Sequence, residues 1–400
     1  MRKITTILLL TLATTVAYAQ HDVKKGFKFA ESQTEVLLKA TADAQSKATK
    51  HNLVAPRTVD AQGNLVLIPS RDWVSGFFSG ELWYLYEYTH NNKWLEAAKD
   101  FTAKIEPEQY NGDSHDVGFK VYTSIGNAYR LTNDAHDKDA IINAAKTLST
   151  RFKPAVGCIK SWDGIKKWPF PVIIDNMMNL ELMFEATRLS GDSSFYKIAV
   201  THANTTLKNH FRPDYSSYHV VDYDPATGEV RHRQTAQGFA DESAWARGQA
   251  WGLYGFTMCY RETHDKKYLA QAEHIAQFIL NNPTLPADKV PYWDFNAPGI
   301  PNEPRDASAA AVIASALYEL STYSANGKLY KTTADKIVNS LTTSYTAKPG
   351  ESQGFILLHS TGHKPAKSEI DVPISYADYY YLEALIRQDR LAKKEPVVKR

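Results

Sequence analysis

Six aspartates recur at the start of six similar segments of the sequence. Each opens a run rich in small and aromatic side chains, and the six residues are Asp72, Asp116, Asp175, Asp241, Asp306 and Asp371. Two facing carboxyl groups can cleave a glycosidic bond, because one donates a proton while the other positions water or tunes the first. The alternative for each aspartate is a helix N-cap, a position at which Asp is strongly preferred.

Tryptophans accompany these segments. Six of them lie near the segment starts or in the connecting loops, namely Trp73, Trp162, Trp168, Trp245, Trp251 and Trp293. Flat aromatic faces suit the C–H face of a pyranose, and the pattern therefore favours a carbohydrate site. The alternative is a core role, because Trp side chains are usually well buried.

Other common chemistries find little support. The sequence has no HExxH motif, no GxSxG elbow, no P-loop, no GxGxxG motif and no EF-hand loop. Its 13 histidines are scattered without ligand spacing, so no metal site is expected. The two cysteines, Cys158 and Cys259, cannot form a disulfide framework and are expected to be inert.

The first 19 residues have the features of a secretory signal peptide. Arg2 and Lys3 precede an apolar run, and Ala17-Tyr18-Ala19 forms a small-x-small cleavage site. Removing this leader lowers the 46 Lys and Arg residues to 44, which equals the number of Asp and Glu residues. A mature chain without net charge argues against a nucleic-acid partner. No later segment reaches about 18 consecutive apolar residues, so we expect a periplasmic or secreted protein without membrane insertion.

Each aspartate-bearing segment predicts a helix that is apolar on most of its sides. Such a helix must be surrounded by other elements, whereas an amphipathic helix needs only one covered face. An amphipathic partner follows each of the first five segments, at residues 94–105, 140–152, 195–207, 268–282 and 329–341. The sixth segment has no long partner after it, but residues 27–45 can supply one.

The repeat therefore predicts an all-α fold, a single (α/α)6 barrel of six inner and six outer helices over residues 20–400. An open solenoid is the alternative, which the irregular spacing of 44 to 66 residues disfavours. A small inserted β-hairpin is expected over residues 218–233, where alternating sequence flanks a Pro and Gly turn. Parallel inner helices would gather the six aspartates on one rim, beside positive helix ends.

Several motifs resemble those of the unsaturated glucuronyl hydrolases of glycoside hydrolase family 88. They are HDVGF at 115–119, DNMMN at 175–179, WARGQAW at 245–251, DVP at 371–373 and YADYY at 376–380. The resemblance runs from about Asp72 to Leu385. It implies an (α/α)6 barrel that needs no metal or organic cofactor. The implied activity removes a 4,5-unsaturated uronic acid from the non-reducing end of oligosaccharides left by polysaccharide lyases.

The resemblance also assigns roles to individual residues. By motif position, Asp175 corresponds to the general acid/base and Asp116 to the second carboxylate that interacts with it. The expected substrate-binding residues are Trp73, His115, Trp162, His219, Gln237, Arg247 and Trp251. Of these, Trp162 is expected to stack on the next sugar, and the position of His219 depends on counting through the inserted hairpin.

The implied reaction places demands on these residues. The C4=C5 bond of the substrate is an enol ether, so protonation at C4 makes C5 electrophilic toward water. The acid must therefore hold a proton near neutral pH, which a like-charged neighbour and burial of an aspartate both favour. Arg247 is suited to the substrate carboxylate. Its alternative role is a salt bridge to Asp241 or Glu242 at the same helix start.

Other interpretations stay open at this point. The segment His359–Lys364 is polar and cationic, and it either lines the subsite of the next sugar or forms a solvated loop. Unsaturated rhamnogalacturonyl hydrolases have the same fold and chemistry but act on pectin fragments. The chain could also be a sugar-binding barrel without catalysis, which the presence of both Asp116 and Asp175 disfavours, or an epimerase-type barrel, which would need a histidine pair.

Overall fold

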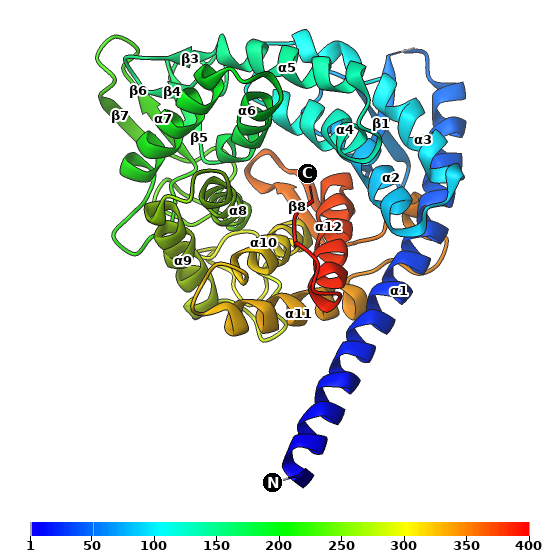
Figure 1. Ribbon diagram of the computed structural model, residues 1–400. Helices are drawn as coiled ribbons and strands as arrows, with labels where there is room; N and C mark the ends of the chain where they lie inside the picture. Colours follow the sequence, from blue (N-terminus) through cyan, green and yellow to red (C-terminus); the bar gives the residue numbers. More distant parts are fainter. Residues whose placement is uncertain (1, 51, 400) are drawn as a thin grey trace.

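The computed structural model describes residues 2–50 and 52–399, with side chains from Val23 onward. Within this part of the chain, six helical segments form an inner ring. They are α2 (Ser75–Thr89), a π-helix (Gly118–Gly126) continued by α4 (Asn127–Thr132), α6 (Asn176–Ser190), α8 (Ala246–Thr263), α10 (Ala307–Leu320) and α12 (Ser375–Ala392). Each segment contacts the next, and α12 returns to α2 (Figure 1). The ring is therefore closed, and the open solenoid is excluded.

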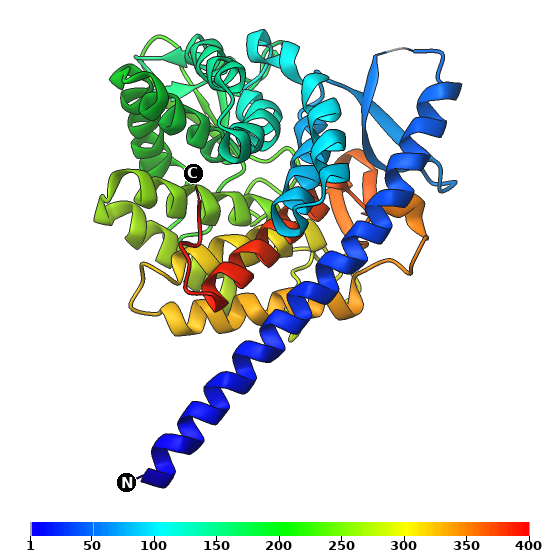
Figure 2. The same ribbon diagram turned by 45° about the vertical axis from the view of Figure 1, so that its right-hand side comes forward.

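An outer helix packs against each inner segment. The outer helices are α3 (Asn92–Ala103), α5 (Ala135–Ser149), α7 (Ser193–Asn209), α9 (Lys266–Asn281), α11 (Gly327–Ser344) and α1 (Arg2–Lys47). The last of these lies against α12 and completes the outer ring (Figure 2), which confirms the predicted role of residues 27–45. The leader predicted for residues 1–19 lies outside the part of the chain whose side chains are described.

The sequence explains which helices lie in the inner ring and which lie in the outer ring. The inner helix α10 reads ASAAAVIASALYEL and is buried on every side. The outer helices α5, α7 and α9 are each preceded by an N-cap aspartate, namely Asp134, Asp192 and Asp265, whose side chain accepts a backbone N–H of the first turn. Among the described residues no helix is long and apolar enough to cross a bilayer. The thiols of Cys158 and Cys259 are free and buried, Cys259 in this core and Cys158 in a small cluster with Phe170 and Tyr223.

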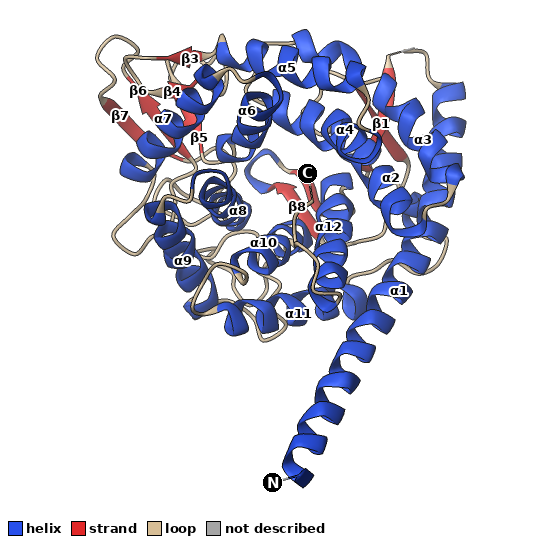
Figure 3. Cartoon of the chain, viewed as in Figure 1, coloured by secondary structure: helices blue, strands red, loops and turns tan. Residues whose placement is uncertain are grey.

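Short strands in the connections between helices form small antiparallel sheets (Figure 3). The predicted hairpin is confirmed as β6 (Val220–Tyr223) and β7 (Val230–Gln234), and β5 (Pro171–Ile173) adds a third antiparallel strand. The other pairs are β1 (Leu53–Val59) with β2 (Leu65–Pro69), β3 (Phe152–Lys153) with β4 (Cys158–Ile159), and β8 (Ser360–His363) with β9 (Ser368–Val372). Three short 3-10 helices complete the described elements, at Glu106–Tyr110, Ser352–Gly354 and Lys364–Ala366. The interpretation of residues 359–364 as a plain loop was wrong, because most of this segment pairs with β9.

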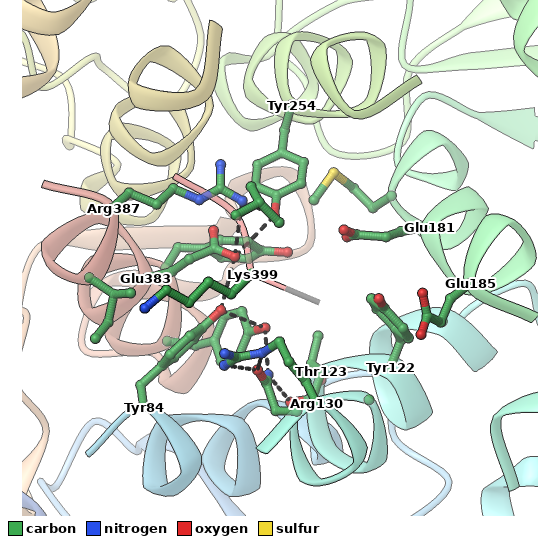
Figure 4. Close-up of a pocket in the computed structure, with 18 of the residues that line it drawn as sticks. Tyr84, Tyr122, Thr123, Arg130, Glu181, Glu185, Tyr254, Glu383, Arg387 and Lys399 are labelled. Atoms are coloured by element: carbon green, nitrogen blue, oxygen red, sulfur yellow. Dashed lines mark hydrogen bonds and ion pairs between the residues drawn. The ribbon is translucent and has the colours of Figure 1, made fainter. Parts of the chain in front are cut away.

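The inner helices run parallel, and polar side chains of their middle and later turns line a pocket (Figure 4), a set of side chains that we call the polar layer. Glu383 accepts hydrogen bonds from the hydroxyl groups of Tyr84, at 2.9 Å, and Tyr254, at 3.0 Å. Arg387 donates to Tyr254 at 2.7 Å and lies 3.1 Å from Glu319. Charges at this end of the barrel are therefore paired with one another.

Replacing Arg387 with Ala tests whether this layer holds the barrel together. Arg387 lies 3.3 Å from Glu383, so the change leaves this buried carboxylate without its cation. We therefore expect the free energy of unfolding to fall by about 3–5 kcal/mol. Urea denaturation measures this loss. The control Lys348→Ala breaks an exposed ion pair with Glu351 and should cost less than about 1 kcal/mol. Equal, small losses in both variants would contradict a structural role for the layer.

Candidate active site

Asp116 and Asp175 lie at the starts of neighbouring inner segments. The backbone N–H of Phe119 donates to Asn179 Oδ1 at 3.0 Å and thereby joins the two helix starts. Gly118 permits this approach, because a Cβ atom there would lie 2.6 Å from the same oxygen. The pair predicted from the motifs is therefore brought together by residues of the same two motifs.

Neither carboxyl group of this pair caps its helix. Asp175 makes no side-chain cap hydrogen bond, and Asp116 instead accepts a hydrogen bond from Ser114 Oγ at 2.9 Å. By contrast, Asp306 caps α10. Asp72 accepts a hydrogen bond from the backbone N–H of Val74, but Val74 is itself the N-cap residue of α2 and no side chain caps this helix. The cap explanation therefore applies to Asp306 but not to the predicted catalytic pair.

The carboxyl group of Asp175 is buried beside several charged groups. Burial raises its pKa to about 7, and the charge of Asp116 adds to this shift. The positive charge of Arg247 and the indole of Trp251 act in the opposite direction. Asp175 can therefore hold a proton near neutral pH, as the sequence analysis required, and burial is the main cause.

His219 lies beside Asp175 in a fixed tautomer. Its Nδ1 atom accepts hydrogen bonds from the backbone N–H groups of Ala236 and Gln237, both at 3.1 Å. The ring proton must then be on Nε2, which lies 3.7 Å from Asp175 Oδ2. Burial lowers the pKa of His219 well below its ordinary value, so the ring is neutral and presents one N–H to the site.

A second buried histidine lies beside the other carboxylate. His115 Nε2 is 3.3 Å from Asp116 Oδ1. Burial also lowers the pKa of His115. The two carboxylates of the site thus each have a buried imidazole as a neighbour.

Arg247 occupies the first turn of α8 and is fully buried. Its Nη1 atom lies 2.7 Å from Asp306 Oδ2, so the predicted alternative of a salt bridge to Asp241 or Glu242 was wrong. The guanidinium group also donates to the backbone carbonyls of Thr361 and Gly362, at 2.7 Å and 2.6 Å. Arg247 therefore connects the catalytic end of the barrel to the β8–β9 hairpin.

A cleft of about 230 Å³ opens beside Arg247. Four of the predicted substrate-binding residues line it: Trp73, Trp162, Gln237 and Arg247. Trp73 and Trp162 are partly exposed, as residues that stack on a sugar should be. The other four tryptophans named in the sequence analysis are buried: Trp168, Trp245, Trp251 and Trp293.

Several cleft residues escaped the sequence analysis. Arg57 of β1 lines the cleft between Asp72, at 2.8 Å, and Glu369, at 2.5 Å. Tyr376 lies under Trp73, with ring centroids 5.1 Å apart. Only Tyr376 had a signal in the sequence, because it begins the YADYY motif. Arg57 and Glu369 come from hairpins that the sequence analysis did not predict.

Buried polar atoms without a partner gather at this site. Among the described residues, five such atoms belong to Asp175 (Oδ2), His219 (Nε2), Arg247 (Nε), Trp251 (Nε1) and Tyr376 (Oη). Unsatisfied buried groups are rare in folded proteins, and a cluster of them needs an explanation. A polar ligand that enters from the cleft would satisfy them. No group of three or more His, Cys, Asp or Glu side chains in the described part of the chain could hold a metal ion.

Comparisons with known proteins agree with this geometry. Residues 57–390 match the model of glycosyl hydrolase family 88. An unsaturated glucuronyl hydrolase from Formosa agariphila is 51% identical over 343 residues, which cover 85% of this chain and 86% of the relative. An unsaturated chondroitin disaccharide hydrolase from Streptococcus pneumoniae is 32% identical over 84% of this chain and 86% of its own.

Solved structures give the same result. A crystal structure of an unsaturated glucuronyl hydrolase specific for heparin superposes with a TM-score of 0.87 at 49% identity, covering 94% of this chain and 99% of the other. The enzyme from Bacillus sp. GL1, described as responsible for glycosaminoglycan degradation, gives a TM-score of 0.82 at 31% identity and covers 93% and 99%. With relatives at this identity and a family match over most of its length, the chain belongs to glycoside hydrolase family 88.

Proposed function

We propose that the protein removes a 4,5-unsaturated glucuronic acid from the non-reducing end of glycosaminoglycan oligosaccharides made by lyases. The observation that carries this proposal is the buried carboxyl group of Asp175, whose pKa burial raises to about 7, among polar atoms that lack partners. An acid with a pKa near 7 suits proton transfer to carbon at neutral pH. The relatives that match this chain are hydrolases of unsaturated glucuronides, which supports the same substrate class.

The proposed reaction begins with proton transfer from Asp175 to C4. The electrons of the C4=C5 bond form the new C–H bond, and C5 becomes an oxocarbenium ion. Water then adds to C5 and gives its proton to the carboxylate of Asp175, which restores the acid. The hemiketal then opens by cleavage of the C5–O5 bond, which gives a ketone at C5 and a hemiacetal at C1. This hemiacetal collapses to an aldehyde, the bond from C1 to the glycosidic oxygen breaks, and the neighbouring sugar leaves as an alcohol. Asp116 contributes the negative charge that helps Asp175 keep its proton before the reaction.

The neighbouring residues have roles in binding. The Nε edge of Arg247 has no partner among the described residues, so it can receive the substrate carboxylate. The N–H of His219 can donate to a substrate oxygen beside Asp175. Trp162 and Trp73 offer sugar-facing aromatic surfaces, and His363 of the β8–β9 hairpin borders the next sugar.

We also propose that the protein is exported to the periplasm or secreted. The support is the sequence of residues 1–19, in which a basic start, an apolar run and Ala17-Tyr18-Ala19 follow the order of a signal peptide. An exported chain that begins at Gln20 would support this assignment. An exported chain that still carries residues 1–19 would contradict it.

Replacing Asp175 with Asn should lower turnover by about a hundredfold or more, because the acid that protonates C4 is lost. The assay follows the ultraviolet absorbance of the conjugated double bond in lyase-made chondroitin, hyaluronan and heparin disaccharides. The control Asp265→Asn changes a helix-cap aspartate of α9 and should retain turnover. Near-normal turnover in folded Asp175→Asn would show that another residue is the acid.

The same variant should be more stable than the wild type at about pH 8. The folded protein holds the Asp175 proton up to a pKa of about 7, whereas the unfolded chain releases it near 3.8. The contribution of this group to stability is therefore present below the lower value and is lost as the pH rises through the higher one. Thermal unfolding from about pH 4 to 8 should show that the advantage of Asn grows with pH. An advantage independent of pH would contradict the raised pKa.

Turnover of the wild type should fall as the pH rises through about 7, because the active form of Asp175 is protonated. In Asp116→Asn, the loss of a like charge lowers the pKa of Asp175, so the alkaline limb should move to lower pH. Profiles of kcat between about pH 5 and 9 measure the alkaline limb in the wild type and in Asp116→Asn. An alkaline limb that does not move would show that the two carboxyl groups act independently.

A further inference from the structure

We infer that Asp306 is a positioning residue that directs one edge of the Arg247 guanidinium group toward the carboxylate of the substrate. This inference rests on the proposed function, because it concerns the uronate group of that substrate. Asp306 is fully buried and does not line the cleft, so it would act through Arg247 and not by contact with the sugar.

The hydrogen bonds of Arg247 leave one edge open. A guanidinium group has five N–H donors. Nη1 donates to Asp306 Oδ2 and to the carbonyl of Thr361, both at 2.7 Å, and Nη2 donates to the carbonyl of Gly362 at 2.6 Å. The N–H of Nε has no partner among the described residues. Nη2 donates to Gly362 alone, so by count one of its two N–H groups is left. Nε and Nη2 share one edge of the guanidinium group, and such an edge can bind a carboxylate through both of its oxygens.

The faces of the guanidinium group are also held. Its Cζ atom lies 4.5 Å from the ring centroid of Trp245 and 5.3 Å from that of Tyr376. Because the faces and the far edge are occupied, rotation of the group would break contacts. The open edge is therefore kept in one direction, and preorganised donors bind a charged ligand without an ordering cost.

Asp306 is itself fixed to the barrel. Its Oδ1 atom accepts hydrogen bonds from the backbone N–H groups of Ser308, at 3.1 Å, and Ala309, at 3.3 Å, and from Ser308 Oγ at 2.5 Å. One oxygen thus caps α10 while the other holds Arg247. The nearby carboxyl group of Asp175 also interacts with Arg247. By binding the far edge of Arg247, Asp306 keeps the cation from turning toward the general acid.

The variant Asp306→Asn separates the two tasks, because Asn is an equally good helix cap but presents an uncharged amide to Arg247. We would measure kcat/KM for an unsaturated disaccharide and for its methyl ester, in which the uronate group has no charge. The ratio of the two values should fall at least about tenfold in Asp306→Asn, the size expected for a charged hydrogen bond. Arg247→Gln should lower the ratio similarly, and the double variant should be no worse than Arg247→Gln alone.

A parallel loss with both substrates, leaving the ratio unchanged, would mean that Asp306 has only a structural role. Additive losses in the double variant would also overturn the inference, since the two residues would then act separately. Asp265→Asn, which alters the cap of α9, is the control and should leave the ratio unchanged. If Asp306→Asn does not fold, Asp306→Ser keeps a capping oxygen and carries the same comparison. Failure of the wild type to cleave any unsaturated disaccharide would instead contradict the proposed function.

Discussion

The burial of the Asp175 carboxyl group is the constraint on which the rest of the site depends. A free aspartate has lost its proton at neutral pH, but removal from water disfavours the charged form and raises the pKa of this one to about 7. The groups around this carboxyl group come from several elements: Asp116 from the preceding inner segment, His219 from the loop before β6, and Arg247 and Trp251 from α8. The barrel and its loops together thus supply the burial that makes Asp175 an acid at neutral pH.

The two ends of the barrel differ in whether their buried polar groups have hydrogen-bond partners. At the end where the later turns meet, Glu383, Arg387 and their neighbours satisfy one another, which favours stability. At the end where the inner helices begin, polar atoms of Asp175, His219 and Arg247 have no partner among the described residues. Leaving these atoms unpaired costs stability, and a bound substrate can recover that cost. The paired layer thus supports a site that is itself unfavourable for folding.

Much of the fold was predictable because its signals are local and repeated. The alternation of apolar and amphipathic helices predicted both rings, and the leftover N-terminal helix predicted how they close. The paired aspartates were predictable because Asp116 and Asp175 lie in recognisable motifs. The partner of Arg247 was not, because Asp306 is 59 residues away and the nearer Asp241 and Glu242 were the obvious candidates. The cleft residues Arg57 and Glu369 also come from distant hairpins whose short strands give little periodic signal.

The central claim is that a proton from Asp175 goes to C4 and water goes to C5, and isotope labelling tests it most directly. The reaction would be run in deuterated water and in oxygen-18 water, and both labels located in the released uronic acid by NMR and mass spectrometry before exchange with solvent. Hydration of the double bond predicts deuterium at C4 and the heavy oxygen at C5. Heavy oxygen at C1, with no early deuterium at C4, would show ordinary glycoside hydrolysis and contradict this account.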